Sequence, residues 1–496
     1  MKLEKILKNV EVQTVYGNID REIGYVSVNS NDIKQKSLFI SIKGFKKDGH
    51  DFVLDAIRNG AVAVVAQKKL DLPENITQVV VRNSRKQLPL IAANYYCHPS
   101  KKIRIIGVTG TNGKTTTCFL INSILRKAKI KSSLITTVQS YISDKPVRFD
   151  RTTPGPVELN NFFSQSLDMG IDFACMEVSS HSIDLHRIDF MDFEGFVFTN
   201  LSQDHLDYHR NMDNYFYTKK KLFMAGYRHL YGGRFAVINV DDEYGKKISA
   251  ITDLDKITFS LNPKNSDIWA ENIKNSIDGI EFDLVSKKSP EKLHIRSFLC
   301  GHFNVYNIMA SIGTAFNFDL STQAIKDGIE SMKGVPGRFE KISCSKGINI
   351  IVDYAHTPDG LLNVLRTSKQ LRRPGSRIIT VFGCGGDRDK EKREVMGSIS
   401  DSYSDYTIIT SDNPRTEDPD SIIEMIEAGF KGANRHKKIT DRKEAILEAL
   451  EMAKSGDIVL IAGKGHEDYQ EFKDYRIHFS DQEIVREWDS CGKNKS

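Results

Sequence analysis

The sequence lacks paired cysteines, long apolar runs and a strong excess of either charge. Its seven cysteines are scattered, and no two are separated by only two residues, which argues against a disulfide framework and favours a reducing compartment. No stretch is apolar for the ~20 residues that a membrane-spanning helix needs, and the N-terminal residues contain no apolar signal segment. We therefore expect a cytoplasmic protein without membrane insertion.

The charges are nearly balanced, with 70 basic and 65 acidic residues and a net charge of +5. This balance gives no support for a nucleic-acid partner, and it leaves binding of an anionic small molecule possible. We expect small-molecule substrates and a monomer. Hydrophobic residues make up 40% of the chain, enough for several cores. At ~150 residues per domain, a chain of 496 residues is predicted to form about three domains.

The pattern of apolar runs predicts an α/β protein with three domains. Residues 1–102 are predicted to form a smaller N-terminal α/β domain, in which strand-like runs at 37–42 and 61–66 flank a helix-like segment at 52–58. Residues 103–335 are expected to form a doubly wound, mostly parallel sheet that carries a phosphate loop. Residues 336–496 are expected to form a Rossmann-like C-terminal domain.

Further strands are predicted where β-branched runs are followed by polar or glycine-rich turns. These runs lie at 103–108, 173–178, 195–199, 235–240, 348–352, 377–382 and 458–462. In open α/β sheets, ligands bind beyond the carboxyl ends of the strands. The segments that follow these runs are therefore where functional residues are expected.

A glycine-rich loop, Gly107–Thr116, lies between a predicted strand and an amphipathic stretch at 116–127. Gly110 and Gly113 let backbone N–H groups turn toward phosphate, Lys114 supplies a positive charge, and the Thr115 hydroxyl can bind Mg²⁺. The alternative is a glycine-rich turn with an incidental lysine, which the strand before it and the helix after it disfavour. The loop alone predicts nucleoside triphosphate binding.

Other motifs follow the loop in a fixed order along almost the whole chain. They are Thr152–Pro154, Glu177–His181, Asn200–His209, Gly301–Asn307, Gly337–Glu340, Asp353–Asp359, Gly383–Asp389, Asp412–Arg415 and Gly463–Glu467. With the loop, they resemble the Mur ligases and the folylpolyglutamate synthetases. The resemblance implies that ATP phosphorylates a substrate carboxylate and that an amine then attacks the acyl phosphate to give an amide.

The resemblance also implies an ATP site, with Arg338 reaching the phosphates from beyond a glycine- and proline-rich hinge. The implied ATP-binding residues are Gly110, Thr111, Asn112, Gly113, Lys114, Thr115, Thr116, Asn304, Asn307, Arg338 and Asp353. For Asn304 and Asn307 the alternative is a capping role in a turn or helix, which is common for asparagine.

Two Mg²⁺ ions are implied by the same resemblance. Their expected protein ligands are Thr115, Glu177, His205 and a carbamylated lysine, and the implied catalytic residues are Lys114, Glu177, His205 and Lys219. Three consecutive lysines at 219–221 could carry the carbamate, and the family's spacing to the following Leu-Phe pair selects Lys219. The alternative is an exposed basic run.

The sugar nucleotide expected from the resemblance is UDP-N-acetylmuramoyl-L-Ala-D-Glu. The implied contacts are Ser30, Thr152, Thr153, Ser179 and Arg187. The chain departs from the family here. Residues 29–31 read Asn-Ser-Asn where the family usually has Asp-Ser-Arg, and Leu185 stands where the family often has glutamine.

The motif at 412–415 resembles the version found in family members that add meso-diaminopimelate. The implied contacts are Arg388, Asp412, Asn413, Pro414, Arg415, Gly463 and Glu467, with Glu467 suited to an ammonium group. The guanidinium of Arg415 can pair with the second carboxylate of diaminopimelate in bidentate fashion. Facing lysine, which lacks that carboxylate, a buried Arg415 is expected to be left unpaired, which gives discrimination of roughly 10⁴ or more.

Three alternatives are weighed against this interpretation. A lysine-adding Mur ligase is disfavoured by Arg415, and a folylpolyglutamate synthetase is disfavoured by the domain that precedes the phosphate loop. A non-catalytic ATP-binding scaffold of the same fold would be favoured by loss of catalytic residues, yet Lys114, Glu177, His205 and a lysine at 219 are all present.

Overall fold

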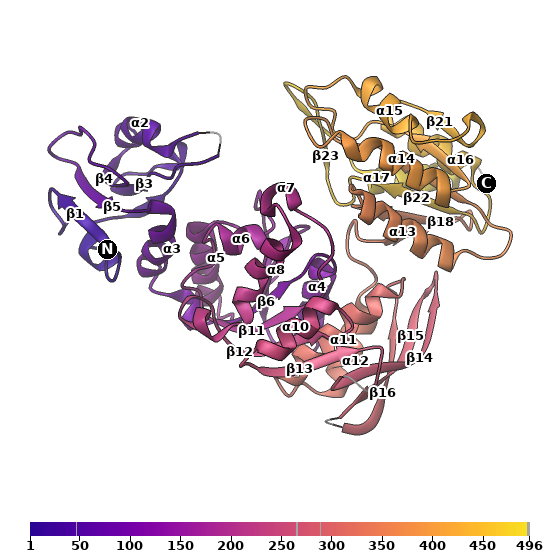
Figure 1. The fold of residues 1–496 in the computed structure, drawn as a ribbon, viewed down its shortest axis with the longest axis horizontal. Helices are drawn as coiled ribbons and strands as arrows, with labels where there is room; N and C mark the ends of the chain where they lie inside the picture. Colours follow the sequence, from indigo (N-terminus) through magenta and orange to yellow (C-terminus); the bar gives the residue numbers. More distant parts are fainter. Residues whose placement is uncertain (46, 264–265, 288, 494–496) are drawn as a thin grey trace. The chain divides into compact units, whose positions relative to one another are not determined.

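The computed structural model describes residues 1–45, 47–263, 266–287 and 289–493. Contacts divide the chain into two compact units. The first consists of Met1–Trp269, Ser286–Lys288 and Asn307–Ile325, and the second of Ala270–Val285, Ser289–Tyr306 and Lys326–Ser496. The fold is α/β, as predicted, and is built on several largely parallel sheets (Figure 1). The predicted domain boundaries at 102/103 and 335/336 stay predictions.

The first part of unit one is a five-stranded sheet. In spatial order its strands are β1 (Val12–Tyr16), β5 (Thr77–Val81), β4 (Ala61–Ala66), β3 (Ser37–Ile40) and β2 (Tyr25–Ser27). All pairs are parallel except β1 with β5. Its helices are α1 (Leu3–Ile6), α2 (Val53–Arg58) and α3 (Ser84–Tyr95). Strands β4 and β5 are almost wholly buried because two separate apolar clusters cover the sheet, which explains their continuous apolar runs.

A larger sheet follows in unit one. Its order is β13 (Asp255–Ser260), β12 (Gly232–Asn239), β11 (Phe193–Phe198), β6 (Arg104–Thr109), β10 (Phe173–Glu177), β7 (Ser132–Ile135), β8 (Ser140–Ile142) and β9 (Lys145–Val147). The strands from β13 to β7 are parallel, whereas β8 and β9 are antiparallel additions. From β6 the chain runs past β10 to β7, whereas from β10 it crosses back past β6 to β11, so the connections reverse direction between β6 and β10. Such a switch point is where open α/β sheets bind ligands.

The helices that accompany this sheet include three of 13 or 14 residues and several shorter ones. They are α4 (Lys114–Lys127), α5 (Pro156–Asp168), α6 (Ser180–Asp184), α7 (Leu206–His209), α8 (Met212–Lys220), α9 (Arg228–Tyr231), α10 (Glu243–Ile251), α11 (Phe303–Phe316) and α12 (Thr322–Ser331). Strands β14 (Ile268–Ser276), β15 (Gly279–Ser286) and β16 (Ser289–Ser297) follow α10 and β13 in the chain and neighbour one another in that order.

Unit two contains a six-stranded sheet. Its order is β17 (Glu340–Ile342), β18 (Asn349–Asp353), β22 (Ile458–Ala462), β19 (Ile378–Phe382), β20 (Tyr406–Ile409) and β21 (His436–Lys438). Only β17 is antiparallel to its neighbour. A hairpin of β23 (Tyr469–Glu471) and β24 (Arg476–His478) lies outside this sheet.

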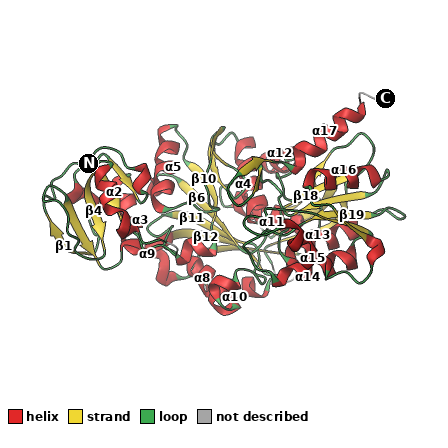
Figure 2. Ribbon diagram, turned by 90° about the horizontal axis from the view of Figure 1, so that it is seen from above, coloured by secondary structure: helices red, strands yellow, loops and turns green. Residues whose placement is uncertain are grey.

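Helices cover both faces of this sheet. Figure 2 shows α13 (Pro358–Leu371), α14 (Glu391–Tyr403) and α15 (Pro419–Glu427) on one side of β18 and β19, with α16 (Arg442–Met452) and α17 (Asp481–Lys493) on the other. Each side has its own apolar cluster. The sheet is therefore buried on both faces, and its functional residues must come from the loops at the strand ends.

Two further properties bear on the sequence-based expectations. Among the residues that the structure describes, no helix is both long and apolar enough to cross a membrane. Six cysteines are free thiols, and Cys97 is exposed, whereas Cys344 is half-buried and the other four are buried. The side chain of Cys491 lies outside the described residues.

An ion pair between Arg393 and Glu417 joins α14 to the residues before α15. Both Arg393 Nη atoms donate to the Glu417 carboxylate over 2.9 Å, and the Arg393 side chain is fully buried. The hydrogen bonds from Arg393 lower the pKa of Glu417 to about 2. Because the folded-state pKa lies below the ordinary value of 4.5, this stabilisation is present above pH 4.5 and is lost as the pH falls toward 2.

Glu417→Gln is therefore expected to lower the free energy of unfolding by about 2 kcal/mol at pH 7 and by much less at pH 3. Chemical unfolding of the full chain at both pH values measures the difference. Glu448→Gln, which removes an exposed partner of Lys437, is the control and should change stability by less than ~0.5 kcal/mol. An equal deficit at both pH values would show that the charge of Glu417 is not responsible.

Candidate active site

The phosphate loop has a backbone that only glycine fits at two positions. Strand β6 ends at Thr109 and α4 begins at Lys114. Gly110 has a φ of 147° and Gly113 a φ of 83°. A Cβ atom would lie 2.0 Å from Thr199 Oγ1 at Gly110 and 2.3 Å from Asn307 Oδ1 at Gly113. The loop thus leads directly into the N-terminus of a 14-residue helix, where free N–H groups and the helix dipole favour a phosphate.

Asn200, which follows β11, holds this loop through hydrogen bonds. The Thr111 N–H donates to the Asn200 carbonyl over 2.9 Å, and the Asn112 N–H donates to Asn200 Oδ1 over 3.0 Å. Lys114 Nζ donates to the carbonyls of Gly110 and Thr111 over 3.0 and 2.7 Å. The predicted phosphate-binding charge therefore lies on the loop itself. Thr116 is buried in the first turn of α4.

Thr115 and Glu177 meet at the carboxyl ends of neighbouring strands. The β6–β10 register pairs Val108 with Glu177, and Thr115 Oγ1 donates to Glu177 Oε1 over 2.8 Å. Glu177 is 1% exposed and also accepts from the N–H and hydroxyl of Thr137. A buried carboxylate beside a hydroxyl, at the start of a phosphate-binding helix, is a hard oxygen donor set of the kind that Mg²⁺ prefers.

Lys219 is the buried member of the lysine run at 219–221. Its side chain is 1% exposed, whereas Lys220 and Lys221 are half-buried. Lys219 Nζ donates to the Gly110 carbonyl over 2.9 Å and to Thr109 Oγ1 over 3.3 Å. Burial lowers the pKa of Lys219 well below its usual value, as does repulsion by Lys114, with Asp204 opposing them. The neutral amine that reacts with CO₂ is therefore favoured here.

His205 belongs to the same charged group. It precedes α7 with a φ of 54°, and its Nε2 lies 3.5 Å from Asp204 Oδ2. Burial lowers the pKa of His205, Asp204 raises it, and Lys114 and Lys219 lower it further, so these side chains act on one another.

The unmodified side chains of the described residues form no cluster of three or more His, Cys, Asp or Glu suited to a metal ion. A metal here would need Thr115, a modified lysine or nucleotide oxygens in addition.

Four of the five residues predicted to bind the sugar nucleotide lie beside Glu177. The hydroxyl of Thr137 joins Thr152 to Glu177, and Thr153 Oγ1 donates to the Glu177 carbonyl over 2.9 Å. Thr153 also contacts Ser179 and accepts from Arg187. The fifth, Ser30, is buried in the N-terminal sheet region, where its carbonyl accepts from Asn59.

Two further arginines near this group were missed from the sequence. Burial lowers the pKa of Arg187 to about 10, with added repulsion from Arg151 and Arg85. Three guanidinium groups close enough to repel one another form a field suited to an anion. The three positions are far apart in sequence and belong to no single motif, so only the fold reveals that they share a site.

The residues predicted to contact adenine and ribose occupy different environments. In unit one, Asn307 on α11 accepts a hydrogen bond from Thr117. In unit two, the Asn304 amide donates to the Cys300 carbonyl over 2.7 Å, a contact that does not decide between nucleotide binding and capping. Arg338 lies 5.0 Å from the centre of the Tyr354 ring, and its buried Nε has no hydrogen-bond partner among the described residues. A buried donor without a partner fits a ligand at this position.

Asp353 ends β18 and is held by the backbone around it. Its carboxylate accepts hydrogen bonds from the N–H groups of Phe339 and Ala355 over 2.6 and 2.8 Å. Burial raises the pKa of Asp353, and Arg338 opposes that rise. The carboxylate therefore fixes the Gly337–Glu340 turn, in addition to any contact with a ribose.

The loops after β19, β20 and β22 bring the predicted amino-acid contacts together. Gly386 N–H donates to the Asn413 carbonyl, and a Cβ on Gly386 would lie 1.9 Å from the Pro414 carbonyl oxygen. Gly463 has a φ of 116°, and a Cβ there would lie 2.7 Å from the carboxylate of Asp412. Arg388 is exposed beside Gly385.

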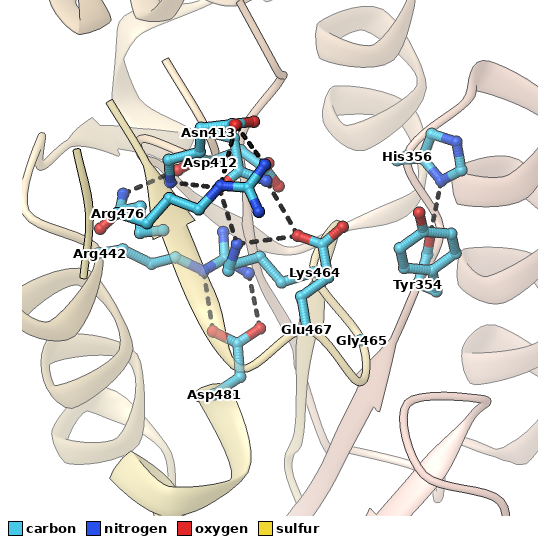
Figure 3. Close-up of polar contacts among 12 residues, drawn as sticks. Tyr354, His356, Asp412, Asn413, Arg442, Lys464, Gly465, Glu467, Arg476 and Asp481 are labelled. Atoms are coloured by element: carbon cyan, nitrogen blue, oxygen red, sulfur yellow. Dashed lines mark hydrogen bonds and ion pairs between the residues drawn. The ribbon is translucent and has the colours of Figure 1, made fainter. Parts of the chain in front are cut away.

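A buried polar network underlies these loops. Asn413 Nδ2 donates to Glu467 Oε2 over 2.9 Å, and the fully buried Lys464 donates to both Asn413 Oδ1 and Glu467 Oε2. Figure 3 shows Lys464 beside Glu467, with the Arg442 guanidinium on the carboxylate of Asp481. Sequence reasoning missed Lys464, although it lies inside the motif Gly463–Glu467.

Arg415 corrects one sequence-based expectation. Its Nε donates to Glu471 Oε2 over 2.9 Å and its Nη1 donates to the Gly386 carbonyl over 2.8 Å. The prediction that Arg415 would be left unpaired without a substrate carboxylate was therefore wrong. The residue that changes this is Glu471 of β23, which lies far along the chain and carries no motif signal.

Three family models match the chain. The description "Mur ligase family, catalytic domain" matches residues 22–96, "Mur ligase middle domain" matches 108–315, and "Mur ligase, glutamate ligase domain" matches 337–465. A relative from Clostridium tetani (strain Massachusetts / E88), named UDP-N-acetylmuramoyl-L-alanyl-D-glutamate–2,6-diaminopimelate ligase, is 43% identical over 492 residues, which cover 98% of this chain and 99% of that protein.

Solved structures show the same similarity. One described as UDP-N-acetylmuramoyl-L-alanyl-D-glutamate–2,6-diaminopimelate ligase has a TM-score of 0.69 and 31% identity, and the match covers 99% of each chain. A Mycobacterium tuberculosis folylpolyglutamate synthase complexed with ADP has a TM-score of 0.61 and 17% identity, over 76% of this chain and 91% of that one. The second match shows the fold alone.

Proposed function

The chain belongs to the Mur ligase family, and we propose from this membership that it attaches meso-2,6-diaminopimelate to the D-glutamate side chain of UDP-N-acetylmuramoyl-L-Ala-D-Glu. The family consists of ATP-dependent ligases that form amide bonds. The proposed reaction is a step in the synthesis of the peptidoglycan cell wall. The observation that carries the choice of amino acid is the arrangement around Arg415.

Groups of opposite charge near Arg415 support this choice. Arg415 pairs with Glu471, and Asn413, two residues before it, donates to the carboxylate of Glu467. The far end of diaminopimelate carries both an ammonium and a carboxylate, whereas the far end of lysine carries only an ammonium. Glu467 suits the ammonium that both amino acids share, and Arg415 suits the carboxylate that only diaminopimelate has.

The proposed reaction has two steps, and different groups of the chain assist it. The proposed reaction transfers the γ-phosphoryl group of ATP to the glutamate side-chain oxygen. The amine then attacks the acyl carbon, phosphate leaves, and the amine loses a proton. Lys114 and the N-terminus of α4 bind phosphate oxygens, and Glu177 with Thr115 provides oxygen ligands for a metal. Mg²⁺ bound there would neutralise charge on the transferred phosphoryl group.

Lys219 is proposed to act as a carbamate. Its burial, its position against the Gly110 carbonyl and the nearby Lys114 all favour an uncharged amine that can react with CO₂. The product is an anionic oxygen donor at the phosphate loop, close enough to His205 for the two groups to interact. This is the ligand type that the unmodified side chains of the described residues do not supply in sufficient number. Domains at 1–102, 103–335 and 336–496, a monomeric state and a cytoplasmic location are part of the same proposal.

Lysine addition by the same fold is the competing function. Because Glu471 already partners Arg415, lysine would not leave the guanidinium wholly unpaired. The discrimination against lysine is therefore expected to be about 10² to 10³, below the 10⁴ that an unpaired arginine would give. A scaffold without catalysis would bind ATP without coupled turnover.

An end-point assay distinguishes these functions. Purified protein is given ATP, Mg²⁺, UDP-N-acetylmuramoyl-L-Ala-D-Glu and either meso-diaminopimelate or L-lysine, and both ADP and the new amide are measured. Product with diaminopimelate and little with lysine is expected. The reverse preference would overturn the choice of amino acid, and ADP release in neither case would overturn the enzyme assignment.

Arg415→Ala is expected to raise the KM for diaminopimelate about 100-fold, because it removes one partner of a charged pair. The KM for ATP should stay within about twofold, since Arg415 lies in the loop after β20. Steady-state kinetics with each substrate varied in turn measure both values. Arg372→Ala, which removes an exposed arginine paired with Asp405, serves as the control for loss of a guanidinium in the same unit.

A further inference from the structure

Glu471 lies between two arginines at the edge of the proposed diaminopimelate site. Its Oε2 accepts from Arg415 Nε over 2.9 Å, and its Oε1 accepts from Arg476 Nε over 3.0 Å. The backbone adds two bonds, because Arg415 N–H donates to the Glu471 carbonyl over 3.1 Å and Glu471 N–H donates to Asn413 Oδ1 over 2.9 Å. The β23–β24 hairpin is therefore joined to the 412–415 loop through both backbone and side chains.

Among the residues that the structure describes, these contacts leave one edge of Arg415 available. A guanidinium has five N–H donors, and the bonds to Glu471 and Gly386 use the Nε donor and one on Nη1. The remaining donors lie at Nη1 and Nη2, the edge that can bind a carboxylate in bidentate fashion. The Arg415 side chain is 23% exposed, so this edge is reachable. Its backbone has a φ of 51°, so the loop at this position depends on surrounding contacts.

The second arginine matters for the electrostatic field. A pair formed by Arg415 and Glu471 alone would have no net charge and would attract an anion weakly. Arg476 bonds the other oxygen of the same carboxylate. The three side chains Arg415, Glu471 and Arg476 therefore carry one net positive charge together. The hydrogen bonds from Arg476 lower the pKa of Glu471, which burial opposes and Arg415 reinforces, so Glu471 is ionised at neutral pH.

We propose that Glu471 and Arg476 are positioning residues for diaminopimelate recognition: Glu471 fixes the Arg415 guanidinium so that its Nη1–Nη2 edge meets the far carboxylate, and Arg476 keeps the group positive. This inference rests on the proposed function, because it assigns these residues to that substrate's second carboxylate. It makes the hairpin at 469–478 a part of the specificity site, although the hairpin lies outside the main sheet.

Glu471→Gln in the full-length enzyme tests the proposal. The KM for meso-diaminopimelate is expected to rise about tenfold, while kcat and the KM for ATP stay within about twofold. The weak kcat/KM for L-lysine should be unchanged, so the ratio between the two amino acids should fall by the same factor. Glu471→Asp, which keeps the charge, is expected to recover part of the loss.

Arg476→Gln is the second variant, and because its side chain is 60% exposed it should fold normally. It is expected to raise the KM for diaminopimelate about threefold and to make that KM less sensitive to salt. The reason is that it removes a positive charge but keeps the bond between Glu471 and Arg415. Glu483→Gln is the matched control. It breaks the exposed ion pair between Glu483 on α17 and His478 on the hairpin, and it leaves the contacts of Arg415 unchanged. The control should match wild type.

The outcomes are separable. Wild-type enzyme that makes no product with diaminopimelate would refute the proposed function and this inference with it. An active wild type with an unchanged diaminopimelate KM in Glu471→Gln would refute the inference alone. A lowered Tm with equal rises in every KM would assign Glu471 a purely structural role and would also refute it.

Discussion

Lys219→Met is expected to lower kcat about 10³-fold, the largest effect on activity that we predict. Methionine fills a similar volume on α8, so packing beneath the phosphate loop is retained, but no amine is left to contact Gly110 or to form a carbamate. ADP release in the presence of all three substrates measures the loss. Lys220→Met is the control, because Lys220 is half-buried and lies over the Phe216 and Tyr217 rings. Its kcat should stay within about twofold of wild type.

The carbamate can be distinguished from an unmodified lysine because it contains a carbon atom taken from CO₂. Wild-type protein prepared without CO₂ is expected to lose activity and to regain it on addition of bicarbonate, with a ¹³C-labelled carbamate signal that Lys219→Met lacks. Small carboxylic acids should partly restore Lys219→Ala, because they supply an anionic oxygen in the space that the side chain leaves. Full activity without CO₂ would exclude the carbamate, and full activity of Lys219→Met would exclude any role for this lysine.

Asp481→Asn is expected to have the largest effect on stability, a loss of about 3–5 kcal/mol. Arg442 Nε and Nη2 donate to the two oxygens of Asp481 over 2.9 and 2.8 Å, and both side chains are fully buried. Arg442 Nη1 already has no hydrogen-bond partner among the described residues. Neutralising Asp481 would leave a buried guanidinium without the carboxylate that it bonds directly, and the interactions with Asp412 and Glu467 replace that bond only in part. This loss is more costly than losing an exposed pair.

The adjacent pair on the same two helices provides the control for this prediction. Lys443 on α16 and Glu487 on α17 are both more than half exposed, and Lys443→Gln should change the free energy of unfolding by less than ~0.5 kcal/mol. Denaturant unfolding of the full chain compares the variants. Similar small changes in Asp481→Asn and Lys443→Gln would show that burial does not govern the strength of the Arg442–Asp481 pair.

Much of the fold was predictable because buried strands leave continuous apolar runs. The runs at 61–66 and 458–462 match β4 and β22 residue for residue, and the run at 173–178 exceeds β10 by one residue. Strands with weaker patterns, such as β1 and the β23–β24 hairpin, were missed. Their residues are partly exposed and mixed in character, so no periodicity distinguishes them from loops.

Residues of the candidate site were predictable where they belong to a sequence motif. They were not predictable where only the fold brings them to the site. Thr115 and Glu177 could be assigned from sequence, and the structure brings them within 2.8 Å. Glu471, Arg85 and Arg151 could not be assigned, because their importance arises from contacts with residues far away in the chain. The role of Arg415 was understood only in part, since the expectation that it lacked an internal partner depended on a hairpin that the sequence did not reveal.

The burial of Lys219 has a consequence for how its modification would proceed. An amine that is 1% exposed and bonded to the phosphate loop cannot collide freely with dissolved CO₂. Uptake of labelled bicarbonate into the folded protein should then be governed by transient opening around α8, and its rate should follow hydrogen exchange of the amides there. A carbamate formed in this way would outlast falls in dissolved CO₂ that are shorter than the interval between openings, so the enzyme's activity would follow the gas composition with a delay set by that interval.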